Sequence, residues 1–278
     1  MHAALPALAP DQTAEAWDAV VDAYEEGFEP FTNTFASAAL ELAGVGPRSR
    51  ILDVATGPGG LALAALARGA EVAAVDFAPG MIRRLRQRLS GEQRWRAQSL
   101  VMDGQDLAFP AATFDAAFSN FGLIFFPEPA RGLGELHRVL KPGGRAVVVA
   151  WSSPQRHEAL QLLLQVLATV QEDFRPAEGT PPWLCFADPE VFHCALSDAG
   201  FASATIHTVT RTWEIASVEP FVQQAPHLSP GTNCLFDSLD PDTADAFASA
   251  LRTRLREQFG DGPVRFRAEA HLGVARKK

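Results

Sequence analysis

Two acidic residues and the glycine-rich segment between them carry the clearest chemical signal in this sequence. Asp53 precedes the segment 56–60, which reads T-G-P-G-G, and Asp76 follows 19 residues after Gly57. Glycine lacks a Cβ atom, so such a segment can turn sharply and let a ligand lie against its backbone. A carboxylate about 20 residues beyond a glycine turn accepts hydrogen bonds from ribose hydroxyls. The spacing therefore predicts a site for an adenosine-bearing ligand, with a tight turn and a polar strand end as the alternative.

The elements around these residues follow the order strand, turn, helix. Residues 51–54 form a short apolar run with β-branched members, which is typical of a buried strand, and residues 61–67 are helix formers. Helix amides and the helix dipole would then face a ligand at the turn. Further apolar runs end near residues 75, 102, 120 and 151, with helical segments between them. This alternation predicts a doubly wound parallel sheet in an α/β protein.

The segments on either side of this core differ from it. Two helices are expected before the first strand, and Trp17 and Tyr24 lie on one stripe of the first of them. These helices would pack across the mouth of the ligand crevice, where the polar end of Tyr24 makes it a candidate contact. Beyond Trp151, residues 204–215 and 264–275 alternate as strands, and helices are expected at 155–170 and 217–259. We expect the late strands to add an antiparallel edge and the helices to form a lid.

Composition narrows the possible partners. The chain has 278 residues, of which 47% are hydrophobic, and its formal net charge is −9. One elaborated domain is as consistent with this length as two. An acidic protein is a poor match for a nucleic-acid polyanion. The helix expected after Asp76 has arginines at 83, 84, 86 and 88, which we assign to a solvated face.

The cysteines and the apolar runs bear on the compartment. Cys185, Cys194 and Cys234 are odd in number and form no C-x-x-C pair, which favours free thiols in a reducing compartment and no metal site. No apolar run approaches the length of a membrane span, and the first residues lack a basic segment before an apolar one. We therefore expect a cytoplasmic protein with no membrane partner. The Ala- and Pro-rich residues 1–10 and the Pro- and Gly-rich residues 175–182 are expected to be loops.

Four segments together resemble a known family. They are D-V-A-T-G-P-G at 53–59, D-F-A-P-G-M at 76–81, D-G at 103–104 followed by F-P-A-A-T-F-D at 109–115, and R-V-L-K-P-G-G at 138–144. These motifs resemble those of the class I S-adenosylmethionine-dependent methyltransferases, near the ubiquinone/menaquinone-biosynthesis branch. Ala78 stands where that family usually has serine. The resemblance is specific over about 31–151 and diffuse elsewhere.

The resemblance implies a fold and a division of the chain. The fold is an α/β, Rossmann-like, doubly wound sheet of seven strands with the last strand antiparallel and a helical lid. Residues 1–45 would be N-terminal lid helices and residues 46–152 the S-adenosylmethionine-binding core. Residues 153–278 would hold the substrate-lid helices and the last two strands. The turn at 141–144 would precede the fifth strand.

The resemblance also implies S-adenosylmethionine as cofactor and S-adenosylhomocysteine as product. Gly57 and Gly59 would cradle the methionine part, Asp76 the ribose, and Asn120 would offer a carbonyl near the sulfonium. Phe77 and Met81 would sandwich the adenine, and Asp103 would accept from its amino group. The full set of expected cofactor residues is Tyr24, Asp53, Ala55, Thr56, Gly57, Gly59, Asp76, Phe77, Met81, Asp103, Gly104, Asn120 and Phe121.

The expected reaction is in-line methyl transfer to oxygen, nitrogen or carbon of a small aromatic or apolar molecule, with the protein chiefly positioning and desolvating the reactants. The acceptor pocket would be built from Phe31, Phe121, Phe125, Trp151 and Trp183. A general base is needed only for a protonated acceptor. His157, expected in a loop facing the crevice, is the candidate among the histidines at 157, 193, 207 and 227.

Two other function classes remain open. Residues 57–62 also fit the G-x-G-x-x-A pattern of an NAD(P)-dependent oxidoreductase, although no Ser/Tyr-x-x-x-Lys set accompanies it. A non-catalytic module that only holds S-adenosylmethionine would share every cofactor motif. We expect the protein to be a monomer or a homodimer.

Overall fold

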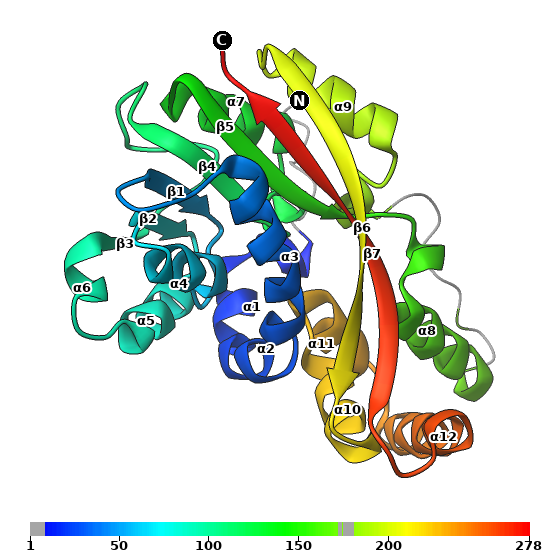
Figure 1. Cartoon of the computed structure of the whole chain (residues 1–278). Coiled ribbons are helices and arrows are strands. Elements are labelled where there is room, and N and C mark those ends of the chain that lie inside the picture. The colour runs from blue at the N-terminus through cyan, green and yellow to red at the C-terminus, as the bar shows by residue number, and fades with distance from the viewer. Residues whose placement is uncertain (1–8, 172–173, 175–180) are drawn as a thin grey trace, which may run out of the picture.

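The described residues of this computed structural model, 9–171, 174 and 181–278, form one sheet of seven strands flanked by helices (Figure 1). The strand order is β3-β2-β1-β4-β5-β7-β6. Strands β1 to β5 are parallel, and β7 runs antiparallel to both β5 and β6. The fold expected from the sequence is therefore confirmed. The strands are β1 Arg50–Val54, β2 Glu71–Asp76, β3 Ala97–Val101, β4 Phe114–Asn120, β5 Leu140–Trp151, β6 Ser203–Ile215 and β7 Val264–Arg276.

The strand order reverses between β1 and β4. From β1 the chain moves outward through β2 to β3 and then returns to the other side of β1. Ligands of doubly wound sheets bind beyond the carboxyl ends of the strands at such a reversal. The apolar runs of β1 and β5 are buried, because helices cover both faces of the sheet and leave little water beside the central strands.

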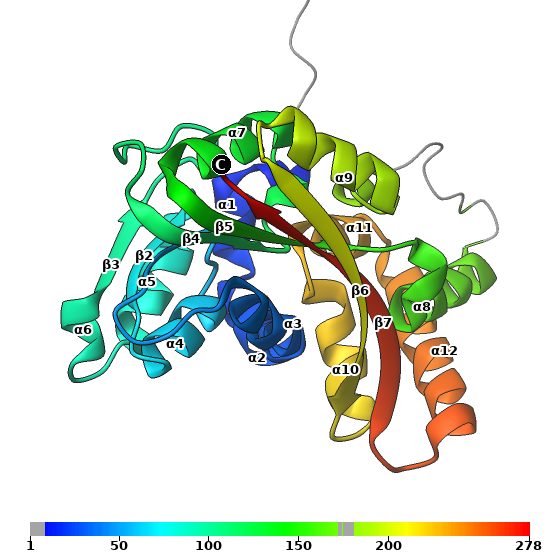
Figure 2. The ribbon, with the colours of Figure 1, turned by 45° about the horizontal axis from the view of Figure 1, so that its top comes forward.

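Helices α4 Gly60–Ala67, α5 Pro79–Arg88 and α3 Glu29–Ala43 lie on one face of the sheet, and α7 Pro129–Val139 and α9 Pro189–Asp198 lie on the other (Figure 2). The short α6 Gln93–Arg96 lies beside β3, at the end of the sheet. Proline occupies the first turn of α3, α5, α7 and α9, where its missing N–H costs no helical hydrogen bond. Asp188 caps α9 by accepting from the Glu190 amide.

The N-terminal helices differ from the expectation in one respect. The stripe from Trp17 to Tyr24 predicted a single helix, but the backbone breaks at Val20, whose φ and ψ are −108° and 7°. The chain forms η1 Pro10–Gln12, α1 Ala14–Ala19 and α2 Val21–Gly27 before α3. The apolar periodicity of the sequence continues across the break, because Val20 and Val21 on either side of it are both buried.

The later half extends the sheet and carries a second group of helices. Strands β6 and β7 run on together beyond β5, and α10 Val218–Gln224, α12 Pro241–Phe259 and α8 Glu158–Val170 lie around this extension (Figure 1). The expected helix at 155–170 begins with the 3₁₀ turn η3 Pro154–Arg156, and the helical stretch 217–259 consists of α10, the 3₁₀ turn η5 Ala225–His227, α11 Pro230–Asp237 and α12. Another 3₁₀ turn, η4, covers Pro182–Leu184, and η2 covers Leu123–Phe125.

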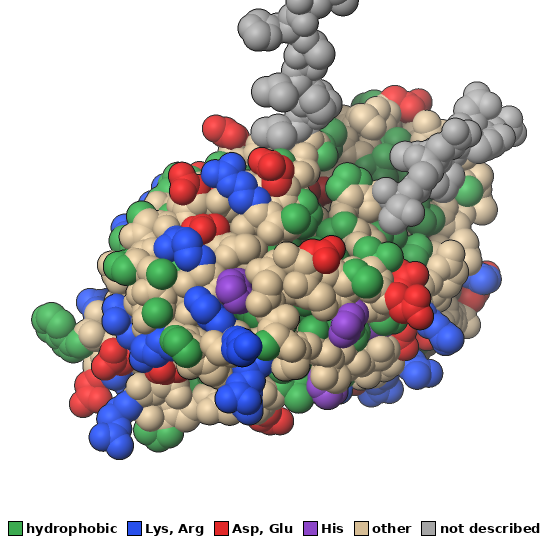
Figure 3. Space-filling model, turned by 90° about the horizontal axis from the view of Figure 1, so that it is seen from above, with side chains coloured by type: hydrophobic (Ala, Val, Ile, Leu, Met, Phe, Trp, Pro, Cys, Tyr) green, Lys and Arg blue, Asp and Glu red, His purple; other side chains and the backbone are tan. Residues whose placement is uncertain are grey.

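Three other expectations need comment. The turn expected at 141–144 is an irregular part of β5, where the pairing with β4 shifts register and Gly143 takes a φ of +77°. The expected loops at 1–10 and 175–182 lie mostly outside the described residues. None of the described helices combines the length and apolar character needed to cross a bilayer. On the face in Figure 3, acidic and basic side chains are interspersed rather than gathered into a field of one sign.

Candidate functional site

A cavity of about 290 Å³ lies at the carboxyl ends of the parallel strands, and a smaller one of about 30 Å³ lies beside it. Five elements of the core line the larger cavity. The turn after β1, the end of β2 and the start of α5 contribute Ala55, Gly57, Asp76, Phe77 and Met81. The ends of β3 and β4 contribute Asp103, Gly104, Asn120 and Phe121. Tyr24 of α2 completes the set of expected cofactor residues that meet here.

The smaller cavity accounts for two of the three other expected cofactor residues. Asp53 and Thr56 line it together with Tyr24 and Asn120. Gly59 instead serves as the N-cap of α4, with a φ of +99° that a residue with a side chain rarely adopts. The expected cofactor residues thus come from distant parts of the chain to one site, because the carboxyl ends of parallel strands share one edge of the sheet.

The glycine turn is held by Asp76. Its Oδ2 accepts from the Gly57 amide at 2.8 Å, and its Oδ1 accepts from the Ala78 amide at 2.9 Å. One carboxylate therefore ties the turn after β1 to the start of α5. Ala55 and Phe121 both take positive φ, at 55° and 62°, and such strain in residues with side chains gathers at functional sites.

Close packing supports this strained geometry. A Cβ atom built on Gly122 would lie 2.2 Å from the Cβ of Ala55, and one built on Gly104 would lie 2.5 Å from side-chain atoms of Phe126 and Val54. Glycines therefore let the loops after β3 and β4 approach the turn after β1.

The most unusual electrostatic feature is a pair of buried carboxylates. Asp53 is 1% exposed and Asp76 5%. Burial raises the pKa of Asp53 to about 7 and that of Asp76 to about 6, and nearby hydrogen bonds offset it only in part. Thr56 Oγ1 donates to Asp53 Oδ2 at 2.6 Å, whereas Asp53 Oδ1 has no hydrogen-bond partner among the described residues. An acidic, underpaired wall of this kind suits a ligand that carries positive charge.

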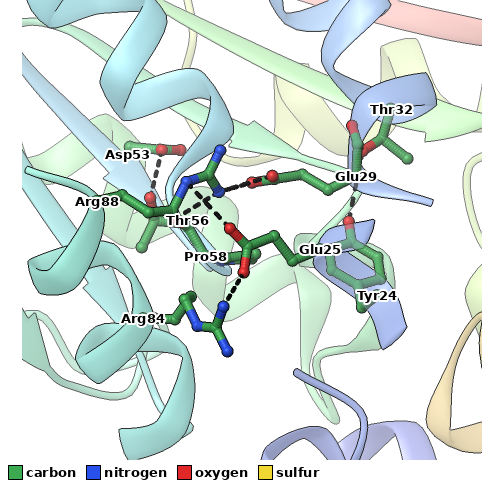
Figure 4. A network of polar contacts seen from close by, with 9 residues as sticks. All are labelled: Tyr24, Glu25, Glu29, Thr32, Asp53, Thr56, Pro58, Arg84 and Arg88. Atoms are coloured by element: carbon green, nitrogen blue, oxygen red, sulfur yellow. Dashed lines mark hydrogen bonds and ion pairs between the residues drawn. The ribbon is translucent and has the colours of Figure 1, made fainter. Parts of the chain in front are cut away.

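An ion-pair network fastens the N-terminal helices to this site (Figure 4). Arg88 of α5 contacts Glu29 at 2.7 Å and Glu25 at 3.4 Å, and it donates to the carbonyl of Pro58 in the glycine turn at 2.9 Å. Arg84, one turn earlier, pairs with Glu25 at 2.6 Å and with Asp22. The expectation of a solvated face was therefore wrong for these two arginines, because their partners come from α2 and α3.

We expect the Arg88→Ala variant to lose about 2 kcal/mol of unfolding free energy, because the buried Glu29 carboxylate loses its ion-pair partner. The loss is smaller than for a fully buried pair because the Arg88 side chain is 26% exposed. Arg84→Ala is the matched control. We expect it to lose at most about 1 kcal/mol of unfolding free energy, because Asp22 is exposed and Glu25 remains paired with Arg88. Urea unfolding measures both. Equal losses of unfolding free energy in the two variants would contradict the greater role assigned to Arg88.

The expected acceptor residues divide into two groups. Phe121, Phe125 and Trp151 line the larger cavity. Phe31 instead lies in the core, 2% exposed and stacked on Trp151 and Trp213. Trp183 belongs to η4 and packs against the core from there.

His157 lines neither cavity, although it contacts Trp151, which lines the larger one. Its Nδ1 accepts from the Leu160 amide at 3.3 Å, which caps α8, and its ring packs edge-on against Trp151. Burial lowers its pKa to about 4. The other candidate histidines, at 193, 207 and 227, are exposed. Across the described residues, no cluster of three or more His, Cys, Asp or Glu side chains could hold a metal ion.

Several cavity residues carried no signal that the sequence analysis used. They include Gln12, Phe28, Thr32, Leu228 and Ser229, which come from the N-terminal helices and from the segment between α10 and α11. Asp11 links these two regions, since its Oδ1 accepts from the Gly231 amide at 3.0 Å. The N-terminal and late segments therefore both contribute to the wall of the cavity.

Residues 52–148 match a family model described as a methyltransferase domain. The chain is 36% identical over 182 residues to the ubiquinone/menaquinone biosynthesis C-methyltransferase of Geobacter sulfurreducens, over 61% of this chain and 70% of that protein. It is 40% identical over 154 residues to the demethylmenaquinone methyltransferase of Clavibacter sepedonicus, over 52% of this chain and 60% of that one. The chain therefore belongs to the S-adenosylmethionine-dependent methyltransferases.

The fold agrees with that assignment. A phosphoethanolamine N-methyltransferase of Haemonchus contortus, solved in complex with S-adenosylmethionine, aligns with 94% of this chain and 57% of its own, with a TM-score of 0.55 and 16% identity. At this identity the likeness concerns the fold alone. Membership of the family disfavours the oxidoreductase alternative, whose glycine pattern residues 57–62 also fit.

Proposed function

We propose that this protein transfers the methyl group of S-adenosylmethionine to a small aromatic or apolar molecule and releases S-adenosylhomocysteine. The observation that carries the proposal is the buried, underpaired Asp53 beside Asp76, in a small cavity that adjoins the larger one with its aromatic side chains. S-adenosylmethionine is cationic at its sulfonium and its ammonium, so it matches this wall in charge. The names of the quinone-biosynthesis relatives agree with a small apolar acceptor.

The chain's own residues would hold the cofactor as follows. The Asp76 carboxylate can accept further hydrogen bonds from ribose hydroxyls while it holds the Gly57 amide. The unpaired oxygen of Asp53 suits an ammonium group. Phe77 and Met81 provide an apolar site for adenine, and Asp103 an acceptor for its amino group. When bound, S-adenosylmethionine supplies a methyl group activated by a positively charged leaving group.

The acceptor side of the cavity has a different character. Trp17, Phe28, Phe125 and Trp151 provide flat apolar walls, which exclude water and orient a flat acceptor. Gln12, Gln105 and Ser229 add neutral polar groups to the lining. This wall favours an acceptor that needs no strong base, and the part of His157 as a base remains a prediction. The acidic net charge argues for a small molecule rather than a nucleic acid.

A two-part experiment tests the proposal. Isothermal titration calorimetry with S-adenosylmethionine, S-adenosylhomocysteine and NADH should show binding of the first two and none of the third. Mass spectrometry of a panel of phenols, hydroquinones, amines and enols, incubated with protein and S-adenosylmethionine, should then show the gain of one methyl group in at least one compound. Absence of S-adenosylmethionine binding would refute the proposal. Binding without transfer to any acceptor would favour the non-catalytic module.

A further inference from the structure

Thr32 connects the two polar residues that α2 and β4 bring to the site. It lies in the first turns of α3, is 1% exposed, and lines both cavities. Its Oγ1 donates to the Glu29 carbonyl at 3.1 Å and lies 3.4 Å from the Tyr24 hydroxyl, as Figure 4 shows for Tyr24. Its carbonyl accepts from Asn120 Nδ2 at 3.3 Å. One residue of α3 is therefore bonded to both Tyr24 and Asn120.

The direction of the bond between Tyr24 and Thr32 follows from the number of protons available. A carbonyl oxygen can only accept, so the single hydroxyl proton of Thr32 goes to Glu29. Thr32 Oγ1 must then accept from the Tyr24 hydroxyl. Burial raises the pKa of Tyr24 well above its usual value, so the hydroxyl keeps its proton. With that proton committed to Thr32, the Tyr24 oxygen has lone pairs left for a ligand.

The orientation of the Asn120 amide follows in the same way. Rotating the amide would place its oxygen against the Thr32 carbonyl, so Nδ2 faces Thr32 and Oδ1 faces away. Among the described residues no group donates to Asn120 Oδ1, although that atom is buried. A buried acceptor without a donor costs about 1–3 kcal/mol, and a positively charged ligand would offset that cost.

We propose that Thr32 is a positioning residue that makes Tyr24 and Asn120 present oxygen acceptors, beside the Asp53 carboxylate, to a positively charged ligand centre. The inference rests on the proposed function and specifies how the site distinguishes cofactor from product. S-adenosylmethionine carries a sulfonium charge, and S-adenosylhomocysteine carries a neutral thioether at the same position. Both carry the same ammonium group, so a difference between their affinities reports on the sulfonium centre and its methyl group. Oxygen acceptors stabilise the cation and not the thioether.

The test compares dissociation constants of the two ligands by isothermal titration calorimetry. Thr32→Val keeps the side-chain shape and the backbone carbonyl but removes the acceptor for Tyr24. We expect it to weaken S-adenosylmethionine binding about fivefold, the equivalent of one hydrogen bond, and S-adenosylhomocysteine binding less than twofold. Thr32→Ser should restore the wild-type ratio. Tyr24→Phe should shift the ratio as Thr32→Val does, and the double variant should lose no more than the larger single loss, because both changes break one interaction.

Thr34 provides the matched control on the same helix. Its hydroxyl also donates to a carbonyl three residues earlier, that of Phe31 at 2.7 Å, so Thr34→Val removes a comparable hydrogen bond away from Tyr24 and Asn120. We expect it to leave both dissociation constants unchanged. Equal weakening of both ligands by Thr32→Val, or additive losses in the double variant, would overturn the role of Thr32 and leave the proposed function standing. Failure of the wild-type protein to bind either ligand would overturn both.

Discussion

Asp76→Ala is expected to weaken binding of S-adenosylmethionine by two to three orders of magnitude, or about 3–4 kcal/mol. The substitution removes the acceptor proposed for the ribose hydroxyls. It also frees the amides of Gly57 and Ala78, which the carboxylate now holds at 2.8 and 2.9 Å. The turn after β1 and the start of α5 would lose their common anchor, so the cofactor would lose both a direct contact and a preorganised cradle.

Calorimetric titration measures this loss, and Asp115→Ala is its control. Asp115 is also a strand aspartate that accepts from a backbone amide of a neighbouring strand, that of Arg50 at 2.8 Å. It lies at the opposite, amino end of the sheet, so its removal should cost some stability and leave S-adenosylmethionine affinity within twofold of wild type. An Asp76→Ala affinity within threefold of wild type would contradict the assigned role of Asp76.

Sequence patterns predicted the core of this protein well, because parallel strands are apolar runs whose ends meet by geometry. The apolar run expected to end near residue 120 is β4, which ends at Asn120, and no long-range information was needed to place Asp76 and Asn120 at one edge of the sheet. The extension of β6 and β7 was visible as alternation, whereas the break between α10 and α11 was not. When short helices follow one another and the apolar periodicity continues through the prolines that join them, the sequence pattern does not show where one helix ends and the next begins.

The site was less predictable wherever a helix rather than a strand supplies the residue. A stripe of apolar residues indicates which face of a helix is buried, but it does not separate core contacts from cavity walls. Phe28, which was not predicted, therefore reaches the cavity, whereas Phe31, which was expected there, packs into the core. The bonds of Thr32 to Tyr24 and Asn120 could not be foreseen, since Asn120 is 88 residues away. Arg88 looked like a surface residue for the same reason, because its buried partner Glu29 is 59 residues away.

Asp53→Asn is expected to stabilise the ligand-free protein at pH 8 while weakening cofactor binding at least tenfold. The folded protein holds the Asp53 proton with a pKa of about 7, against an ordinary aspartate pKa of 3.8. Folding therefore favours the protonated form, and the cost of ionising the buried carboxyl grows as the pH rises from about 4 to about 7. Above pH 7 the whole difference between the two pKa values applies, and it lowers the unfolding free energy by about 4 kcal/mol. Asparagine removes the charge but buries an amide, so we expect a net gain of about 2 kcal/mol.

The same linkage predicts how cofactor binding depends on pH. A cation binds the ionised form of Asp53, so the affinity of the wild-type protein for S-adenosylmethionine should rise between pH 5.5 and 8 and then level off. The rise should be shallower in Asp53→Asn, where Asp76, with a pKa of about 6, is the remaining buried carboxyl of the pair. Thermal melting at both pH values, with and without S-adenosylmethionine, measures stability and binding together.

Asp115→Asn is the control with the opposite sign. Its ion pair with Lys141 and its hydrogen bond from Arg50 lower the pKa of Asp115 despite some desolvation, so removing this charge should destabilise the protein at pH 8. A less stable Asp53→Asn protein, or an affinity for S-adenosylmethionine that does not change between pH 5.5 and 8, would contradict the prediction. The expected pair of effects has one cause: the charge that destabilises the empty site at Asp53 is the charge that attracts the cationic cofactor.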